Sequence, residues 1–276
     1  MRVNMLSDFY IKEHVKHALE EDIGFGDITT ESLANGEIQA QLNAREDGIL
    51  CGCKVFATVF NMLSPGVRID FHFEDGDTIK AGNKIADLHG PAKFILTGER
   101  VALNYLARMS GIATQTRKYA DWASPAKIAD TRKTTPNFRP FEKYAVKIGG
   151  GSLHRFNLSD CAMIKDNHIR FAGSITEAVR KVRENISHAH KIEVECDTLE
   201  QVTEALACRA DIIMLDNMPL ETMHEACRII DKRAIVEASG GVTLETVSAI
   251  AAAGVDIIST SAIITKAHAL DLALDM

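Results

Sequence analysis

The second half of the chain repeats one pattern: a short apolar run, a polar loop, and an amphipathic helical stretch. The runs at 192–195, 212–216, 234–239 and 256–260 end at intervals of 21, 23 and 21 residues. They are apolar along most of their length, which is typical of strands buried on both faces. Capping-box pairs, Ser174 with Glu177 and Thr198 with Gln201, mark helix starts between them. Strict alternation with this short, even period predicts a parallel sheet closed into an α/β barrel of the TIM type.

The first half has a different pattern. We expect a helix over 9–21, short alternating strands over 38–45, 67–73 and near Ile85, and a longer helix over 94–110. These elements predict an α+β, sandwich-like domain at 1–110, followed by the barrel at 111–266. The C-terminal tail, 267–276, is expected to pack on the first domain. In such a barrel the chemistry lies at the carboxyl ends of the strands.

Composition narrows the class of protein. The chain has 276 residues, 46% of them hydrophobic and 25% charged, with a formal net charge of −7. This composition excludes a disordered chain, and the negative charge makes the protein a poor general binder of nucleic acids. No apolar run approaches the ~20 residues of a membrane span, and the stretch that begins at Met1-Arg2-Val3-Asn4 lacks the apolar core of a signal peptide. Six scattered cysteines, Cys51-Gly52-Cys53 among them, are assigned structural roles in a reduced, cytoplasmic protein.

The charge balance reverses between residues 127 and 170, where the sequence has nine basic residues and only four acidic ones. Lys143 and Lys147 are interpreted as part of a solvated helix face. The others of interest follow apolar runs or adjoin the glycines at 149–151, and we expect them at the barrel mouth: Arg132, Lys133, His154, Arg155 and Lys165. Such a local patch in an acidic protein indicates a small polyanionic ligand, and the arginine fork suits carboxylates and phosphates.

Two carboxylates and a glycine loop complete the candidate site. Glu195 and Asp216 end consecutive strands, where they could hold Mg²⁺ or sugar hydroxyls; the alternative is salt bridges with Lys165 or Arg132. Ser239-Gly240-Gly241 follows the next strand, ahead of a helix expected from Thr243. A glycine loop at a helix N-terminus can offer N–H groups to a phosphate.

Several motifs, in this order along the chain, resemble the quinolinate phosphoribosyltransferase family. They are Glu99-Arg100-Val101-Ala102-Leu103-Asn104, Ser110-Gly111-Ile112-Ala113, Asp130-Thr131-Arg132-Lys133-Thr134-Thr135-Pro136, Ile164-Lys165-Asp166-Asn167-His168, Met214-Leu215-Asp216-Asn217-Met218 and Glu237-Ala238-Ser239-Gly240-Gly241. The resemblance runs from about Glu20 to the C-terminus. Two positions depart from the family pattern: Leu153 stands where asparagine is usual, and Ser261 where glycine is usual.

The resemblance implies a reaction and an architecture. Quinolinate and phosphoribosyl pyrophosphate would give nicotinate mononucleotide, pyrophosphate and CO₂ for NAD synthesis, with Mg²⁺. The barrel would be incomplete, and in a homodimer each first domain would close the partner's barrel mouth, with Arg100 reaching in from the partner.

The resemblance also implies a role for each matching residue. Arg132, His154, Arg155 and Lys165 would bind the quinolinate carboxylates, and Lys133 the pyrophosphate. Glu195 and Asp216 would face the ribose and Mg²⁺, and Ser239, Gly240 and Gly241 would hold the 5′-phosphate. Lys133, Lys165, Glu195 and Asp216 form the predicted catalytic set.

Three alternatives remain open on the sequence. One is a phosphoribosyltransferase with a different acidic base, like the ModD-like proteins of molybdenum-transport operons. Another is a barrel enzyme that uses Lys165 as a Schiff-base lysine, which borohydride trapping would reveal. The last is a non-catalytic binding protein that kept the pocket.

Overall fold

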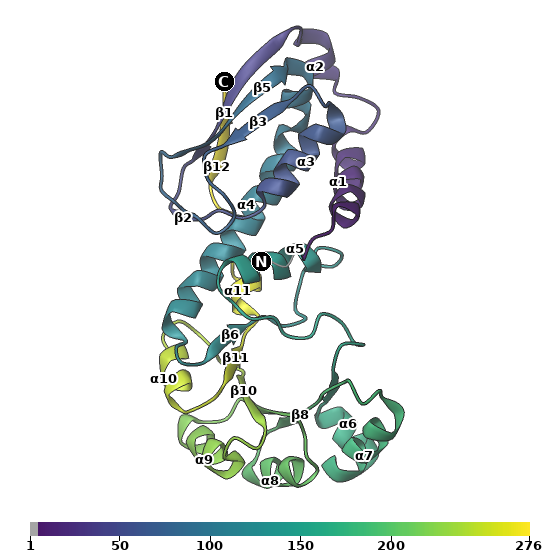
Figure 1. Cartoon of the computed structure of the whole chain (residues 1–276), viewed down its shortest axis with the longest axis vertical. Coiled ribbons are helices and arrows are strands. Elements are labelled where there is room, and N and C mark those ends of the chain that lie inside the picture. The colour runs from purple at the N-terminus through teal and green to yellow at the C-terminus, as the bar shows by residue number, and fades with distance from the viewer. Residues whose placement is uncertain (1–4) are drawn as a thin grey trace. The chain divides into compact units, whose positions relative to one another are not determined.

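The computed structural model of the chain describes residues 5–276, which form two compact units (Figure 1). Residues 1–4, which begin the stretch expected to lack the apolar core of a signal peptide, lie outside the described part. The first unit comprises residues up to 117 together with 135–150 and 267–276, and the second comprises 118–134 and 151–266. The boundary expected at residue 110 therefore falls inside one long helix, α4 (Ala92–Trp122). Residues 135–150, assigned to the barrel from the sequence, pack within the first unit instead.

The first unit is built on a four-stranded antiparallel sheet in the order β12-β1-β5-β3. The strands of this unit are β1 (Glu37–Ala44), β2 (Gly48–Ile49), β3 (Arg68–Phe71), β4 (Thr78–Ile79), β5 (Lys84–Pro91) and β12 (Leu272–Asp275). Its helices, in addition to α4, are α1 (Asp8–Ile23), α2 (Ile28–Leu33), α3 (Cys53–Leu63) and α5 (Arg139–Ile148). The last strand of the chain, β12, pairs with β1, which brings the C-terminal tail into this sheet.

Local sequence accounts for the helices of the first unit. Ser7 caps α1 by accepting a hydrogen bond from Tyr10 N, and Ile11, Val15 and Leu19 form the buried face at four-residue spacing. Phe56 and Phe60 are fully buried on α3, with their ring centroids 5.1 Å apart. Burial of aromatic and aliphatic faces of this kind is the main stabilising contribution in such a unit.

Helix α5 is held to the first unit by an aromatic cluster. Phe141 is fully buried and contacts the rings of Tyr10, His14 and Tyr105. The interpretation of Lys143 as a solvated residue is wrong, because its side chain is fully buried, whereas Lys147 is exposed. The one-turn spacing of the two lysines predicts that they share one helix face, but the packing of the unit buries Lys143 and leaves Lys147 exposed.

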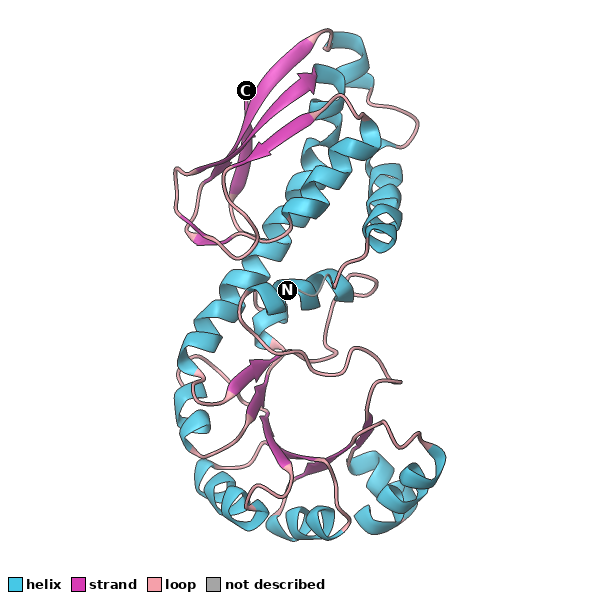
Figure 2. Cartoon of the chain, viewed as in Figure 1, coloured by secondary structure: helices cyan, strands magenta, loops and turns pink. Residues whose placement is uncertain are grey.

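The second unit is a curved parallel sheet of six strands with its helices on the outer side (Figure 2). The strand order is β6-β11-β10-β9-β8-β7, so β6 and β7 are the two open edges. The strands are β6 (Lys127–Ala129), β7 (Ala162–Ile164), β8 (Ile192–Cys196), β9 (Ile212–Asp216), β10 (Ile235–Ser239) and β11 (Ile257–Ser259). The helices are α6 (Asp166–Ala172), α7 (Ile175–Asn185), α8 (Leu199–Ala207), α9 (Leu220–Ile230), α10 (Val247–Ala252) and α11 (Ala262–Thr265).

The predicted alternation of strand and helix is confirmed, and each expected strand end lies within one residue of its observed place. The capping boxes also appear: Ser174 Oγ accepts from Glu177 N, and Thr198 pairs reciprocally with Gln201. One helix start is different, because Thr243 lies in a turn and α10 begins only at Val247. Within residues 5–276, no helix combines the length and the apolar character needed to cross a membrane.

Candidate active site at the carboxyl ends of the barrel strands

A pocket of about 790 Å³ opens in the second unit at the carboxyl ends of its parallel strands. Its lining includes five lysine and arginine side chains and two carboxylates: Arg132, Lys133, Arg155, Lys165 and Lys266, with Glu195 and Asp216. His154, Ser239, Gly240 and Gly241 line it as well. The pocket therefore gathers the residues singled out on the barrel from the sequence, and its excess of positive charge favours an anionic ligand.

The cationic side of the pocket comes from two loops. Arg132 and Lys133 follow β6 and are exposed, and Lys133 N donates to Thr131 Oγ1 at 3.0 Å. Arg155 is half-buried, and its Nη1 donates to the carbonyl of Cys161 at 2.9 Å. That bond orients the guanidinium while leaving other N–H groups for a ligand.

Lys165 and Glu195, at the ends of neighbouring strands β7 and β8, form an ion pair with Nζ and Oε2 2.5 Å apart. The Lys165 side chain is 44% exposed and that of Glu195 14%. This is the salt bridge that the sequence analysis held open for Glu195. It uses one of three ammonium donors, so Lys165 can bind Glu195 and a ligand together. Asp216 ends β9 and accepts from Asn217 Nδ2 at 2.8 Å.

The loop after β10 offers backbone N–H groups. Gly240 and Gly241 have φ of +90° and +61°, which favours glycine, and a Cβ on Gly240 would lie 2.1 Å from Asn217 Oδ1. Within the described residues, neither N–H has a hydrogen-bond partner. Because α10 begins later than expected, any anion here would meet loop N–H groups rather than a helix N-terminus. Ser261 has ordinary right-handed φ and ψ, −76° and −16°, so the backbone there does not require glycine.

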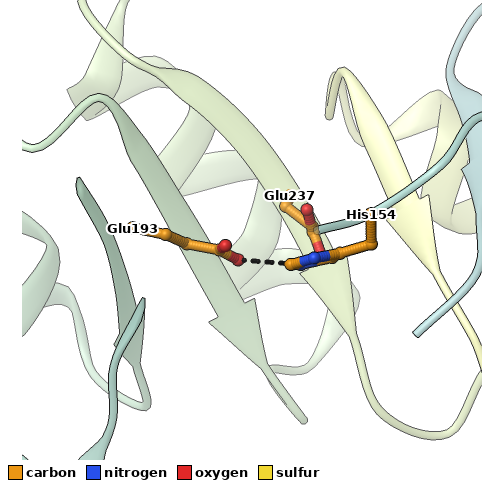
Figure 3. Close-up of side chains that lie close together, drawn as sticks. All are labelled: His154, Glu193 and Glu237. Carbon is orange, nitrogen blue, oxygen red and sulfur yellow. Dashed lines mark hydrogen bonds and ion pairs between the residues drawn. The ribbon is translucent and has the colours of Figure 1, made fainter. Parts of the chain in front are cut away.

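His154 lines the pocket, but its ring faces two buried glutamates beneath the mouth of the barrel. Its ring nitrogen Nε2 lies 3.3 Å from an oxygen of Glu193 on β8 and 3.3 Å from one of Glu237 on β10 (Figure 3). Burial alone would lower the pKa of His154, but hydrogen bonds and charge from the two glutamates raise it to about 10. Burial raises the pKa of Glu193, and the nearby Glu237 carboxylate adds to that shift.

Both ring nitrogens of His154 have partners in the chain, because Nδ1 accepts from the backbone N–H of Arg155 at 2.7 Å. The side chain is only 9% exposed. The contact of His154 with a substrate carboxylate therefore stays a prediction, because each ring nitrogen already has a partner within the protein.

Arg100 is the one predicted site residue that does not line this pocket, which is formed by second-unit residues alone. It lies exposed on α4, with no ion pair to any residue of the described range 5–276. Sequence reasoning also missed Glu193, Glu237 and Asn217. The two glutamates stand inside apolar runs, so a charge at a strand position predicted to be buried was the available signal.

A larger hollow, about 1220 Å³, lies at the opposite, amino ends of the strands. Its acids Asp211 and Asp256 each accept a backbone N–H of a neighbouring strand, from Ile192 and Val236, both at 2.8 Å. Such side-chain-to-backbone bonds hold strands together, and this face of a barrel carries stability rather than chemistry.

Comparison with known proteins points the same way as the geometry. The models for the N- and C-terminal domains of quinolinate phosphoribosyl transferase match residues 27–110 and 112–275. A probable nicotinate-nucleotide pyrophosphorylase (carboxylating) of Bacillus subtilis is 43% identical over 274 residues, covering 98% of this chain and 95% of that protein. One of Synechocystis is 45% identical over 266 residues, covering 94% and 90%.

Solved structures agree in fold. NadC from Streptococcus pyogenes superposes with a TM-score of 0.95 at 39% identity, covering 98% of this chain and 97% of that one. The nicotinate-nucleotide pyrophosphorylase from Francisella tularensis gives 0.95 at 38% identity, covering 100% and 99%. The similarity therefore extends over both units of the chain.

Proposed function

Since the chain belongs to the quinolinate phosphoribosyltransferase family, we propose that its barrel pocket transfers a phosphoribosyl group to quinolinate. Phosphoribosyl pyrophosphate is the donor, and nicotinate mononucleotide, pyrophosphate and CO₂ are the products, as in NAD synthesis. One observation carries the assignment to this pocket: the cations, the two carboxylates and the open glycine N–H groups line a single hollow.

Quinolinate carries two carboxylates, and the cationic side of the pocket suits them. Arg155 and Arg132 offer planar forks, and Lys165 has two donors beyond its bond to Glu195. Lys133, exposed on the loop after β6, is assigned to the pyrophosphate end of the donor. Several cations around one hollow are unfavourable without an anion, so ligand binding relieves their mutual repulsion.

The 5′-phosphate of the donor is assigned to Ser239, Gly240 and Gly241. The N–H groups of Gly240 and Gly241 have no partner among the described residues, and backbone N–H groups that no side chain of their own residue covers suit an anion. The conformation of Ser261 leaves its backbone like that of its neighbours in α11, so the departure from the family glycine is compatible with this assignment.

The ribose and a Mg²⁺ ion are assigned to Glu195 and Asp216. Oxygen ligands from one or two carboxylates, completed by diphosphate oxygens and water, are what Mg²⁺ prefers, so the donor set fits the ion. When bound, the ion would neutralise charge on the departing pyrophosphate. Glu195 is largely shielded, and its charge stabilises the oxocarbenium character that the ribose carbon gains as the bond to pyrophosphate lengthens.

The pyridine nitrogen then bonds to the ribose carbon, and the ring becomes cationic. That ring accepts the electron pair of the carbon–carbon bond as CO₂ leaves, and the vacated ring carbon takes a proton from solvent. No protein nucleophile is required. The Schiff-base alternative for Lys165 and the non-catalytic alternative find no support in the family match.

A homodimer that shares its sites is also part of the proposal. Arg100 is exposed and has no ion pair with any residue from 5 to 276. Large apolar side chains are exposed as well: Phe9, Phe25, Ile28 and Leu33 in the first unit, and Phe171 on α6, which follows Lys165, in the second. Apolar surface of this kind favours an interface, and a two-fold dimer would use it twice. The six free cysteines support a reducing compartment such as the cytoplasm.

The test is a direct assay. Purified protein with quinolinate, phosphoribosyl pyrophosphate and Mg²⁺ should form nicotinate mononucleotide and CO₂ in equal amounts. Nicotinate in place of quinolinate should react poorly, because one of the two carboxylates that the arginines bind is absent. Turnover of nicotinate equal to that of quinolinate, or no product from either, would contradict the proposal.

A further inference from the structure

The seam between β6 and β7, where strand pairing does not close the barrel, is crossed by residues 151–161. The segment is tied to β6 at its start: Ser152 forms a parallel bridge with Ala129, and Ser152 N donates to Ile128 O at 2.7 Å. His154 N then donates to Asp130 Oδ1 at 2.8 Å. Beyond that point the segment leaves the β6 edge, so other contacts must hold it in place.

The imidazole of His154 supplies contacts to the strands of the sheet. It joins the crossing segment to Glu193 on β8 and Glu237 on β10, strands that are themselves separated by β9 (Figure 3). Glu193 and Glu195 are two residues apart on β8 and share its inner face, with Glu193 deeper in the barrel. The His154–Glu193–Glu237 cluster therefore lies directly beneath the pocket.

Burial of the Glu193 and Glu237 carboxylates is unfavourable without the His154 ring beside them. The two glutamates are 0% and 2% exposed, and among the described residues Glu193 Oε2 has no hydrogen-bond partner, while Glu237 Oε1 has the 3.3 Å ion-pair contact with Nε2 but no hydrogen bond. Buried carboxylates are strongly unfavourable unless a positive or proton-donating group faces them. Among the residues the structure describes, the ring of His154 is the group seen to approach both of them. The ring is therefore held in one place.

Nε2 carries a proton that faces the glutamates in either protonation state of the ring. When the ring carries a single proton, the Arg155 N–H that points at Nδ1 places that proton on Nε2. A second proton, at Nδ1, would face the Arg155 N–H. The repulsion between these two hydrogens opposes the double protonation of the ring that the charges of the glutamates favour. A metal ion at Nε2 would displace the proton and force one onto Nδ1, so the Arg155 contact disfavours metal ligation by this cluster.

We infer that Glu193 and Glu237 are positioning residues for quinolinate: through His154 they fix the crossing segment and so hold the guanidinium of Arg155 at the pocket. Arg155 follows His154 directly and is bound to it through the Nδ1 contact. Its Nη1 is bound to Cys161 at the far end of the same segment. In this assignment, which rests on the proposed function, the His154 ring holds the backbone that carries Arg155.

The experiment compares Glu237→Gln and Glu193→Gln with wild type in steady-state kinetics for each substrate. Displacement of Arg155 by about 1 Å should raise the KM for quinolinate about tenfold or more. The KM for phosphoribosyl pyrophosphate and kcat at saturating quinolinate should change less than about twofold. Asp75→Asn is the matched control: it alters a partly buried carboxylate in the first unit that binds Gly52 N and Cys53 N, and should lower stability but change neither KM.

A double-mutant cycle separates positioning from general damage. On an Arg155→Ala background, Glu237→Gln should no longer change the quinolinate KM, because the group it positions is absent. If the glutamine variants fold poorly, His154→Gln and His154→Ala serve instead. Glutamine can place an N–H near the position of Nε2 and should retain most of the quinolinate affinity that alanine loses.

Three kinetic results would overturn the inference: unchanged quinolinate KM in both glutamine variants, an equal rise in both substrates' KM values, or a full Glu237→Gln effect on the Arg155→Ala background. A stoichiometric metal in the purified wild type that Glu237→Gln abolishes would do so as well. Because each variant is compared with active wild type, these outcomes are distinct from failure of the proposed reaction.

Discussion

Gly240→Ala tests the assignment of the 5′-phosphate through a steric clash that can be worked out in advance. With φ at +90°, alanine there is strained by about 1–2 kcal/mol. Its Cβ would also lie 2.1 Å from Asn217 Oδ1, so the Asn217 side chain must move and lose its 2.8 Å bond to Asp216. Because Asn217 is exposed, that bond contributes only about 0.5–1.5 kcal/mol. The expected loss of unfolding free energy is therefore about 1.5–3.5 kcal/mol.

Gly173→Ala is the matched control. Gly173 has φ at +101° and open space where a Cβ would stand, so it carries the backbone strain without the clash. Urea denaturation followed by circular dichroism should show Gly240→Ala to be less stable than Gly173→Ala by about 1 kcal/mol.

Kinetics supply the second readout. Gly240→Ala should raise the KM for phosphoribosyl pyrophosphate, because the shifted loop no longer presents its N–H groups, while Gly173→Ala should not. Equal stability of the two variants, together with a wild-type KM for phosphoribosyl pyrophosphate in Gly240→Ala, would refute both the clash and the phosphate assignment.

Three further predictions address the rest of the site. Arg155→Ala should weaken quinolinate binding by about 2–5 kcal/mol in calorimetry, and Arg155→Lys should recover little of it because the fork is lost; wild-type affinity in the alanine variant would contradict the assignment. Glu195→Gln and Asp216→Asn should lower kcat about a hundredfold and raise the Mg²⁺ requirement in titrations, and normal rates at limiting Mg²⁺ would leave both as structural residues. Arg100→Ala and Lys165→Ala homodimers should each be nearly inactive. Their mixture should recover about a quarter of wild-type activity, because about half of the dimers are then mixed and each of these has one intact site of two. Subunit exchange confirmed by mass spectrometry without recovery of activity would place Arg100 outside the partner's site.

The barrel could be predicted from the sequence because its signals are local. The apolar run, the cap and the loop recur within about 21–23 residues, and pairs such as Thr198 with Gln201 act within one turn. Parallel strands place their carboxyl ends at one edge, so the sequence alone predicts that Lys165, Glu195 and Asp216 converge. Their convergence in one pocket is the part of the site that pattern alone could reach.

Tertiary packing decided the remaining features, because they depend on residues distant in the chain. The helix expected to end near Ser110 continues to Trp122. Gly111 within it permits a close approach of the chain, because a Cβ there would lie 1.8 Å from His268 O. Lys143 has the spacing of a solvated residue, but its unit buries it. His154 pairs with glutamates 39 and 83 positions away in the chain, and only the curvature of the sheet brings their charges together. A sequence shows that a buried charge needs a partner, while the fold determines which residue that partner is.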